Sequence, residues 1–157
     1  MVLFKSLIDQ NRHVALVKGQ PSPSHITDVR VHRQKLLSDV FSQCKSDSRS
    51  VFLYGLKMLQ NVEHGVYVYL SQTPAYSEIP NDFDYLTKIG ASELLENKNV
   101  GAPKRPWVET DPLTLGVGAQ ILRQLGVRKM RVHMTRPMPL RGLLGYDLEV
   151  IETIPVP

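Results

Sequence analysis

Six basic side chains gather in the last third of the chain, and they could bind phosphate groups or nucleic acid. They are Arg123, Arg128, Lys129, Arg131, Arg136 and Arg141. The other interpretation is that they cover solvated faces of a helix and of strands, where most arginines and lysines lie. No aromatic stacking pattern accompanies them. A basic RNA-binding module therefore stays an alternative, and steep salt dependence of RNA binding would favour it.

Few other side chains offer chemistry. Cys44 is the single cysteine, so one chain can form neither an internal disulfide nor a multi-cysteine zinc cage. Asp111 is a candidate base, but an aspartate ahead of a helix is also a common N-cap. His32 ends a predicted strand and is expected to be structural, and His133 is expected to be a surface or hydrogen-bonded residue. No cofactor is expected.

Composition describes an ordinary globular chain. Its 157 residues suit one domain with a sizeable core, expected to span residues 1–157. The apolar fraction is 42% and the charged fraction 22%, and the net charge of +4 only mildly favours anionic partners. No apolar run is long enough to span a bilayer, and no cleavage-like signal follows the first residues. A cytoplasmic location without a membrane partner is therefore expected.

Two successive units of helix, glycine and strand position most of these side chains. Leu115, Ala119, Leu122 and Leu125 recur at helical spacing, with glycines 116 and 118 as a flexible lead-in and glycine 126 as the stop. Basic and apolar residues then alternate over 129–134, as in a half-buried strand. The second unit runs from a helical stretch at 140–144, stopped by glycine 145, to a strand at 148–154. Repeated helix–strand units predict parallel strands with crossover helices and an α/β fold.

The rest of the chain adds further predicted elements. Strands are expected at 13–18, 28–32 and 66–70, the last of them central and covered on both faces; 1–9 is a possible first strand or the start of a piece cut from a longer chain. A helix is expected over 51–60 after a serine cap, with Gly55 marking tight packing. A helix is also predicted over 85–95. The prolines of 71–84 and 96–109 indicate mobile loops.

Several stretches together resemble GTP cyclohydrolase II, an enzyme of riboflavin synthesis. The Gly-Val-Gly-Ala-Gln-Ile-Leu segment beginning at Gly116 and the Gly-Tyr-Asp-Leu-Glu-Val-Ile-Glu ending beginning at Gly145 carry most of the likeness. Shorter matches lie at 13–19, 29–32, 38–41 and 65–72. The resemblance implies a mixed, partly parallel sheet with helices packed on its faces.

The resembled family holds a catalytic zinc ion with three cysteines, and the metal activates water for attack on the guanine ring. The corresponding positions here are Lys35, Ser46 and Ser48. A lysine ammonium repels a divalent cation and serine hydroxyls are poor zinc ligands. Cys44 lies two residues before Ser46 and does not restore the arrangement. No metal is therefore expected.

The nucleotide-binding stretches of the family are altered as well. Its Arg-Gln-Glu-Gly-Arg-Gly run corresponds to residues 71–76, where the charges and glycines are gone. Its Asp-x-Arg pair, proposed as base and nucleophile, corresponds to Asp111 and Leu113, and leucine cannot attack a phosphate. Its phosphate loop corresponds to residues 134–139, which keep the proline but lose the lysine. Arg136 can still contact an anion.

The resemblance therefore implies a relative that keeps the fold and has lost GTP hydrolysis. Such domains are fused behind a dihydroxybutanone phosphate synthase in some bacteria, so that synthase domain is the expected partner, with a role in assembly or regulation and a homodimeric state. The alternative is an enzyme of altered activity with a pocket for an anionic nucleotide or sugar phosphate. Its candidate ligand-binding residues are Arg136, Arg141, Lys35 and Asp111.

Overall fold

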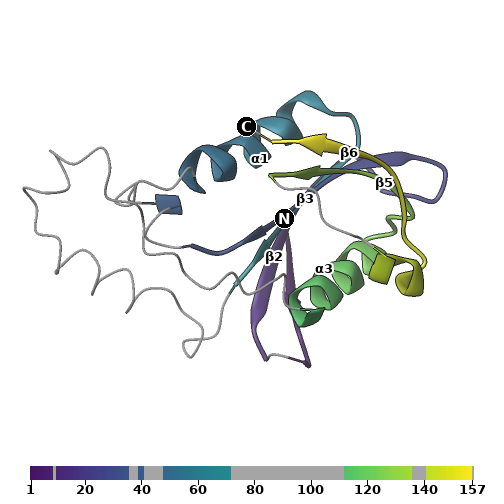
Figure 1. Ribbon diagram of the computed structural model, residues 1–157, viewed down its shortest axis with the longest axis horizontal. Helices are drawn as coiled ribbons and strands as arrows, with labels where there is room; N and C mark the ends of the chain where they lie inside the picture. The colour runs from purple at the N-terminus through teal and green to yellow at the C-terminus, as the bar shows by residue number, and fades with distance from the viewer. Residues whose placement is uncertain (9, 36–38, 41–47, 72–111, 136–140, 157) are drawn as a thin grey trace, which may run out of the picture.

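The computed structural model describes residues 1–8, 10–35, 39–40, 48–71, 112–135 and 141–156 (Figure 1). The predicted loops 71–84 and 96–109 and the predicted helix 85–95 lie outside these ranges, apart from Ser71. Cys44, Ser46, Asp111 and Arg136 lie outside them too. The single-domain organisation of residues 1–157 stays a prediction.

Six strands form one mixed sheet in the order β1-β2-β4-β3-β5-β6. The strands are β1 (Val2–Lys5), β2 (Arg12–Lys18), β3 (Ile26–Arg33), β4 (Gly65–Leu70), β5 (Lys129–Met134) and β6 (Glu149–Pro155). The β1–β2 and β2–β4 pairs are antiparallel, whereas β4, β3, β5 and β6 run parallel to one another. The predicted α/β class and the parallel arrangement of the last two strands are confirmed.

Two helices cover opposite faces of this sheet. Helix α1 (Ser48–Asn61) connects β3 to β4, and α3 (Pro112–Gln124) precedes β5. The chain moves one way along the sheet from β3 to β4 and the other way from β4 to β5. Right-handed crossovers in opposite directions place their helices on opposite faces, and in the view of Figure 1 α1 lies above the sheet and α3 below it.

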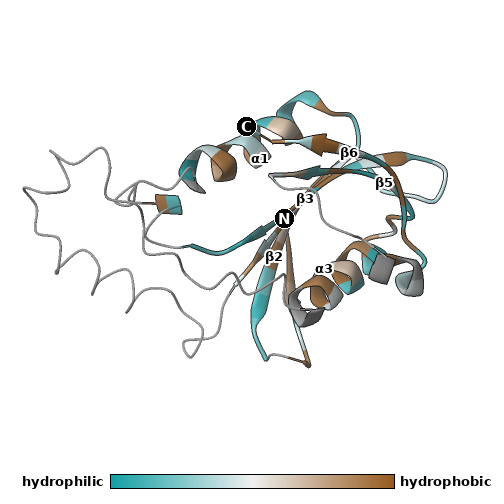
Figure 2. Ribbon diagram, in the orientation of Figure 1, coloured by the Kyte–Doolittle hydropathy of each residue, from teal (hydrophilic) through white to brown (hydrophobic). Residues whose placement is uncertain are grey.

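Strand β4 lies between the two helices, as its continuous apolar sequence predicts. On one face, the ring of Tyr67 lies against Gly55 of α1. On the other face, Val66, Val68 and Leu70 belong to the hydrophobic core that α3 covers. Ala15, Val29, Val66 and Val68 are fully buried there, so the apolar core of the molecule lies on the α3 side of the sheet. Figure 2 shows that α1 carries both hydrophobic and hydrophilic residues, as a helix with one face in solvent requires.

Helix α3 corrects the prediction for its beginning. Glycines 116 and 118 lie inside the helix rather than in a flexible lead-in. A Cβ on Gly118 would lie 3.5 Å from Val31 of β3, and one on Gly116 would lie 2.9 Å from the Tyr146 hydroxyl. A side chain at 116 would therefore have to displace the Tyr146 hydroxyl, whereas a Cβ at 118 would make an ordinary packing contact with β3. Pro112 at the first helical position suits its fixed φ and missing N–H.

The predicted stop of this helix is confirmed. Gly126 has φ +90°. The Val127 N–H donates to the Leu122 carbonyl at 3.1 Å, and the Gly126 N–H donates to the Arg123 carbonyl at 3.0 Å. These two bonds form a Schellman motif, which satisfies carbonyl groups that the helix end would otherwise leave unpaired.

The second helical stretch is a 3-10 helix, η3 (Arg141–Tyr146). Gly145 lies within it and does not stop it, which corrects the prediction. The left-handed residue is instead Asp147, with φ 59°; a short polar side chain tolerates this conformation better than most. No helix in the described part of the chain is long and apolar enough to cross a membrane.

Candidate functional site

The fold places one predicted site residue, Lys35, at the carboxyl end of the parallel strands. The carboxyl ends of strands β3, β4 and β5 lie together here, and ligands commonly bind at this end of parallel strands. Lys35 follows β3 here and is half-buried. The first half of helix α3 passes near this end of the strands, since Gly118 lies against Leu70, the last residue of β4. Of the other predicted ligand-binding residues, Arg141 begins η3 without a described side chain, and Arg136 and Asp111 lie outside the described residues.

Asp39 organises the corner around Lys35. The backbone N–H of Lys35 donates to Asp39 Oδ2 at 2.9 Å, and the backbone N–H of Asp39 donates to the Lys35 carbonyl at 2.7 Å. His32 Nε2 lies 3.0 Å from both carboxylate oxygens of Asp39. The Tyr69 hydroxyl donates to Oδ2 at 3.2 Å. Three donors from β3, β4 and the turn after β3 therefore hold one carboxylate that is only 3% exposed.

Aromatic rings surround this carboxylate and shield it from water. The His32 ring stacks on Tyr69 with ring centroids 5.6 Å apart, and Phe52 of α1 meets the His32 ring edge-on at 5.7 Å. Burial raises the pKa of the Tyr69 phenol, and the neighbouring Asp39 charge raises it further. Tyr69 therefore stays a neutral hydrogen-bond donor, and the corner is a closed, fully paired unit.

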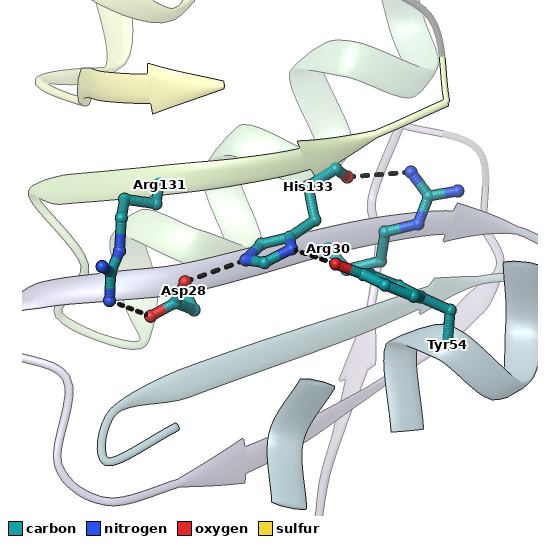
Figure 3. Close-up of polar contacts among 5 residues, drawn as sticks. All are labelled: Asp28, Arg30, Tyr54, Arg131 and His133. Carbon is teal, nitrogen blue, oxygen red and sulfur yellow. Dashed lines mark hydrogen bonds and ion pairs between the residues drawn. The ribbon is translucent and has the colours of Figure 1, made fainter. Parts of the chain in front are cut away.

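A second polar network, which the sequence analysis missed, lies between β3, β5 and α1 (Figure 3). Asp28 Oδ1 lies 2.8 Å from His133 Nε2, and Asp28 Oδ2 accepts a bond from the Arg131 guanidinium at 2.6 Å. The Tyr54 hydroxyl lies 3.0 Å from His133 Nδ1. Because a carboxylate only accepts, we assign the imidazole proton to Nε2, and Nδ1 then accepts from Tyr54. The expected hydrogen-bonded role of His133 thus has named partners.

Arg30 lies beside this network without a carboxylate partner among the described residues. Its guanidinium donates to the His133 carbonyl oxygen at 2.8 Å, and the residue is 7% exposed. Among the described residues, neither the Arg30 Nε nor the hydroxyl of its cross-strand neighbour Tyr67 has a hydrogen-bond partner. Burial lowers the pKa of Arg30 and raises that of Tyr67. A cation and a phenol therefore lie buried side by side between the sheet and α1.

The predicted basic cluster is partly paired within the protein. Arg131 pairs with Asp28, and Arg128 Nε lies 3.2 Å from Asp147 Oδ2. Arg123 donates to the Tyr146 carbonyl at 3.3 Å. Of the four members whose side chains the structure describes, three have acceptors in the chain itself, which leaves fewer of them to bind an external polyanion.

Comparisons of the sequence with known proteins identify its family. The sequence profile of the family described as GTP cyclohydrolase II matches residues 1–155. The riboflavin biosynthesis protein RibBA of Chlorobium phaeovibrioides is 34% identical over 158 residues, covering 99% of this chain and 37% of that protein. The protein of the same name from Synechocystis sp. is 34% identical over 157 residues, covering 98% and 27%.

The chain thus spans about a third of the length of these curated relatives. Among solved structures, the chain is similar to RibBX, a two-domain 3,4-dihydroxy-2-butanone 4-phosphate synthase from A. baumannii. That likeness has 28% sequence identity and a TM-score of 0.48, and it covers 92% of this chain and 33% of that one.

Proposed function

The chain belongs to the GTP cyclohydrolase II family, and from this premise we propose that it is a member without GTP hydrolysis. Its role is the assembly or regulation of a riboflavin-synthesis enzyme. The pathway follows from its curated relatives, which are named as riboflavin biosynthesis proteins. The proposed loss of hydrolysis is supported by the residue types at three positions that correspond to the zinc ligands of the family.

The observation that carries the proposal is the corner around Lys35. The family's first zinc-binding cysteine is a lysine here, at the end of β3. The described side chains nearby that could replace a thiolate, His32 and Asp39, are hydrogen-bonded to each other. Recruiting His32 Nε2 to a metal would break its hydrogen bond to the buried Asp39 carboxylate. The residues present therefore do not fit a zinc ion. The Lys35 ammonium repels a divalent cation, and the two side chains that could act as metal ligands, His32 and Asp39, already bind each other.

The two remaining cysteine positions weigh in the same direction. Ser48 begins α1, and its side chain is not described; Ser46 lies outside the described residues. Neither hydroxyl is a good zinc ligand at neutral pH. The position of the family's attacking arginine is Leu113, in the first turn of α3, which carries no group able to attack a phosphate.

Metal analysis and a GTP turnover assay test the loss of hydrolysis. We expect no stoichiometric zinc and no release of formate from GTP. The matched control is the triple variant Lys35→Cys, Ser46→Cys, Ser48→Cys, which we expect to bind zinc without hydrolysing GTP because Leu113 is unchanged. Stoichiometric zinc together with formate release by the natural chain would refute the proposal.

The regulatory part of the proposal concerns a dihydroxybutanone phosphate synthase, the activity named for the similar solved structure. We expect this chain, supplied in trans or fused, to change the oligomeric state or the kcat/KM of such a synthase. Sedimentation and initial-rate measurements with and without the chain check this. An unchanged synthase in both measurements would leave only the loss of hydrolysis standing.

One observation keeps binding of an anionic nucleotide or sugar phosphate as a second candidate function. Lys35 follows β3 at the carboxyl end of the parallel strands, and its ammonium forms no ion pair within the described part of the chain. We expect inorganic phosphate or GTP to raise the melting temperature, and Lys35→Ala to abolish the shift, since ligands that bind the native state stabilise it. Lys129→Ala, at the opposite end of β5, is the control. An equal shift in both variants would exclude Lys35 as the anion-binding group.

A further inference from the structure

Tyr54, His133 and Asp28 form a chain of hydrogen bonds that runs from α1 through β5 to β3 (Figure 3). The Tyr54 hydroxyl lies 3.0 Å from His133 Nδ1, and His133 Nε2 lies 2.8 Å from Asp28 Oδ1. The second carboxylate oxygen of Asp28 is held by Arg131. A hydroxyl bonded to an imidazole, with the imidazole oriented by a carboxylate, is the arrangement by which many enzymes activate a nucleophile.

Tyr54 differs from the two tyrosines of β4 that lie on the same face of the sheet. Tyr69 donates directly to the Asp39 carboxylate, and burial together with that negative charge raises the pKa of its phenol. Burial also raises the pKa of Tyr67, whose hydroxyl has no hydrogen-bond partner within the described residues. Both of these phenols therefore keep their protons. Tyr54 is the one of the three that bonds to a neutral imidazole, which is a base able to accept the proton.

The surroundings of Tyr54 combine access from solvent with a buried base and a buried cation. Tyr54 is half-buried, whereas Asp28 is 3% exposed and His133 6%. The buried Arg30 guanidinium interacts electrostatically with Tyr54 and has no carboxylate partner within the part of the chain that the structure describes. A fixed cation stabilises negative charge as it develops on a neighbouring oxygen. A small molecule can thus reach the phenol from outside while the imidazole and the guanidinium lie behind it.

We propose that Tyr54 is a nucleophile that accepts the acyl group of a small activated ester or thioester. The Tyr54 oxygen bonds to the acyl carbon, the bond from that carbon to the alcohol or thiol breaks, and the leaving group takes the electron pair. The Tyr54 proton passes to His133 Nδ1, Asp28 stabilises the imidazolium, and the imidazolium returns the proton to the leaving group. This inference goes beyond the proposed function, because it requires neither GTP nor zinc nor a synthase.

The full chain is tested with p-nitrophenyl acetate, because transfer of its acetyl group releases the coloured p-nitrophenolate. We expect a burst of about one p-nitrophenolate per chain, and an acetyl group on Tyr54 in peptide mass spectrometry. Tyr54→Phe should abolish both signals. The matched control is Tyr146→Phe, which should leave the burst unchanged. Tyr146 is also half-buried, but no base bonds to its hydroxyl within the described residues.

The base and the residue that positions it are tested separately. His133→Phe keeps a ring but removes the base, and should slow acetylation of Tyr54 at least about tenfold. Asp28→Asn should lower the rate constant of acetylation without changing the KM for the ester, as expected of a positioning residue. Acetylation of other residues but not of Tyr54 would overturn the proposal, as would a full burst from Tyr54→Phe or an undiminished rate in folded His133→Phe. Circular dichroism of each variant separates loss of activity from loss of the fold.

Discussion

Asp28 joins β3 to β5 through two side-chain contacts. Its carboxylate is 4% exposed and accepts from both Arg131 and His133. The sequence could have indicated part of this network, since Asp28, Arg131 and His133 interrupt otherwise apolar strands on alternating positions. It could not pair them, because Arg131 is 103 residues from Asp28 and Tyr54 is 79 from His133. Only the strand order brings them together.

Asp28→Ala should lower the free energy of unfolding by about 2–4 kcal/mol, because it leaves His133 and Arg131 without their acceptor. The lower end allows for Arg131, whose side chain is 42% exposed and partly hydrated. Urea unfolding measures the loss. Tyr54→Phe, which removes a single hydrogen bond, is the control and should cost about 1 kcal/mol. A loss for Asp28→Ala no greater than for Tyr54→Phe would show that the network is not held through Asp28.

Tyr67 makes a prediction about alkaline pH. Burial raises its pKa above the ordinary value of 10.0. The unfolded chain therefore releases this proton at lower pH than the folded chain, so stability is complete below pH 10 and falls as the pH rises above it. Tyr69 acts in the same direction.

The Tyr67→Phe variant isolates this contribution. The Tyr67 hydroxyl has no hydrogen-bond partner in the part of the chain that the structure describes. Removing it should therefore cost little stability at neutral pH and should flatten the alkaline loss of stability. Melting temperatures from neutral pH to above pH 10 measure both effects. A steeper alkaline loss in the variant than in the natural chain would contradict the assignment.

At the scale of elements, the glycines show which helix boundaries can be predicted from sequence and which cannot. Gly126 was recognisable because it follows a complete apolar stripe, and Gly55 because it interrupts one. Glycines 116 and 118 were misread as flexible, and Gly145 as a stop. Their meaning depends on what lies opposite in space, here Tyr146 and Val31 for the first two and nothing for the third. Sequence alone does not contain that information.

Gly55 provides the element-scale prediction. A Cβ here would lie 2.6 Å from the Tyr67 ring, so Gly55→Ala must push α1 away from β4. The expected loss is about 1–3 kcal/mol for overpacking, reduced by up to about 1 kcal/mol from better helix propensity. Gly145→Ala is the control, because no atom lies within 4 Å of its Cβ position. Thermal unfolding compares them, and equal melting temperatures would show that α1 moves freely at this contact.

At the scale of the whole molecule, the sequence predicted the class of fold but not the strand order. The parallel β5–β6 pair follows from the repeated helix–strand units, and the family follows from local motifs. The position of β3 between β4 and β5 does not, since these contacts join segments far apart in the chain. The same limit applies to the site: the proposed absence of zinc ligands is argued from side-chain types alone, but the bond between His32 and Asp39 could not be predicted from them.

The position of each strand predicts a gradient of local stability. Amides of β4 lie between two helices and two neighbouring strands and should exchange slowest. Amides of β6, an edge strand, should exchange among the fastest of the sheet. Hydrogen exchange followed by mass spectrometry measures this, and uniform protection across the sheet would contradict it.

The two faces of the sheet differ in the residues that they bury. The α3 face holds the apolar core that keeps the chain folded, and the α1 face holds the titratable and aromatic layer where chemistry could reside. Substitutions of polar residues on the α1 face leave the apolar packing on the α3 face in place. A protein with this arrangement can therefore lose polar residues on the α1 face and still keep the apolar core that folds it.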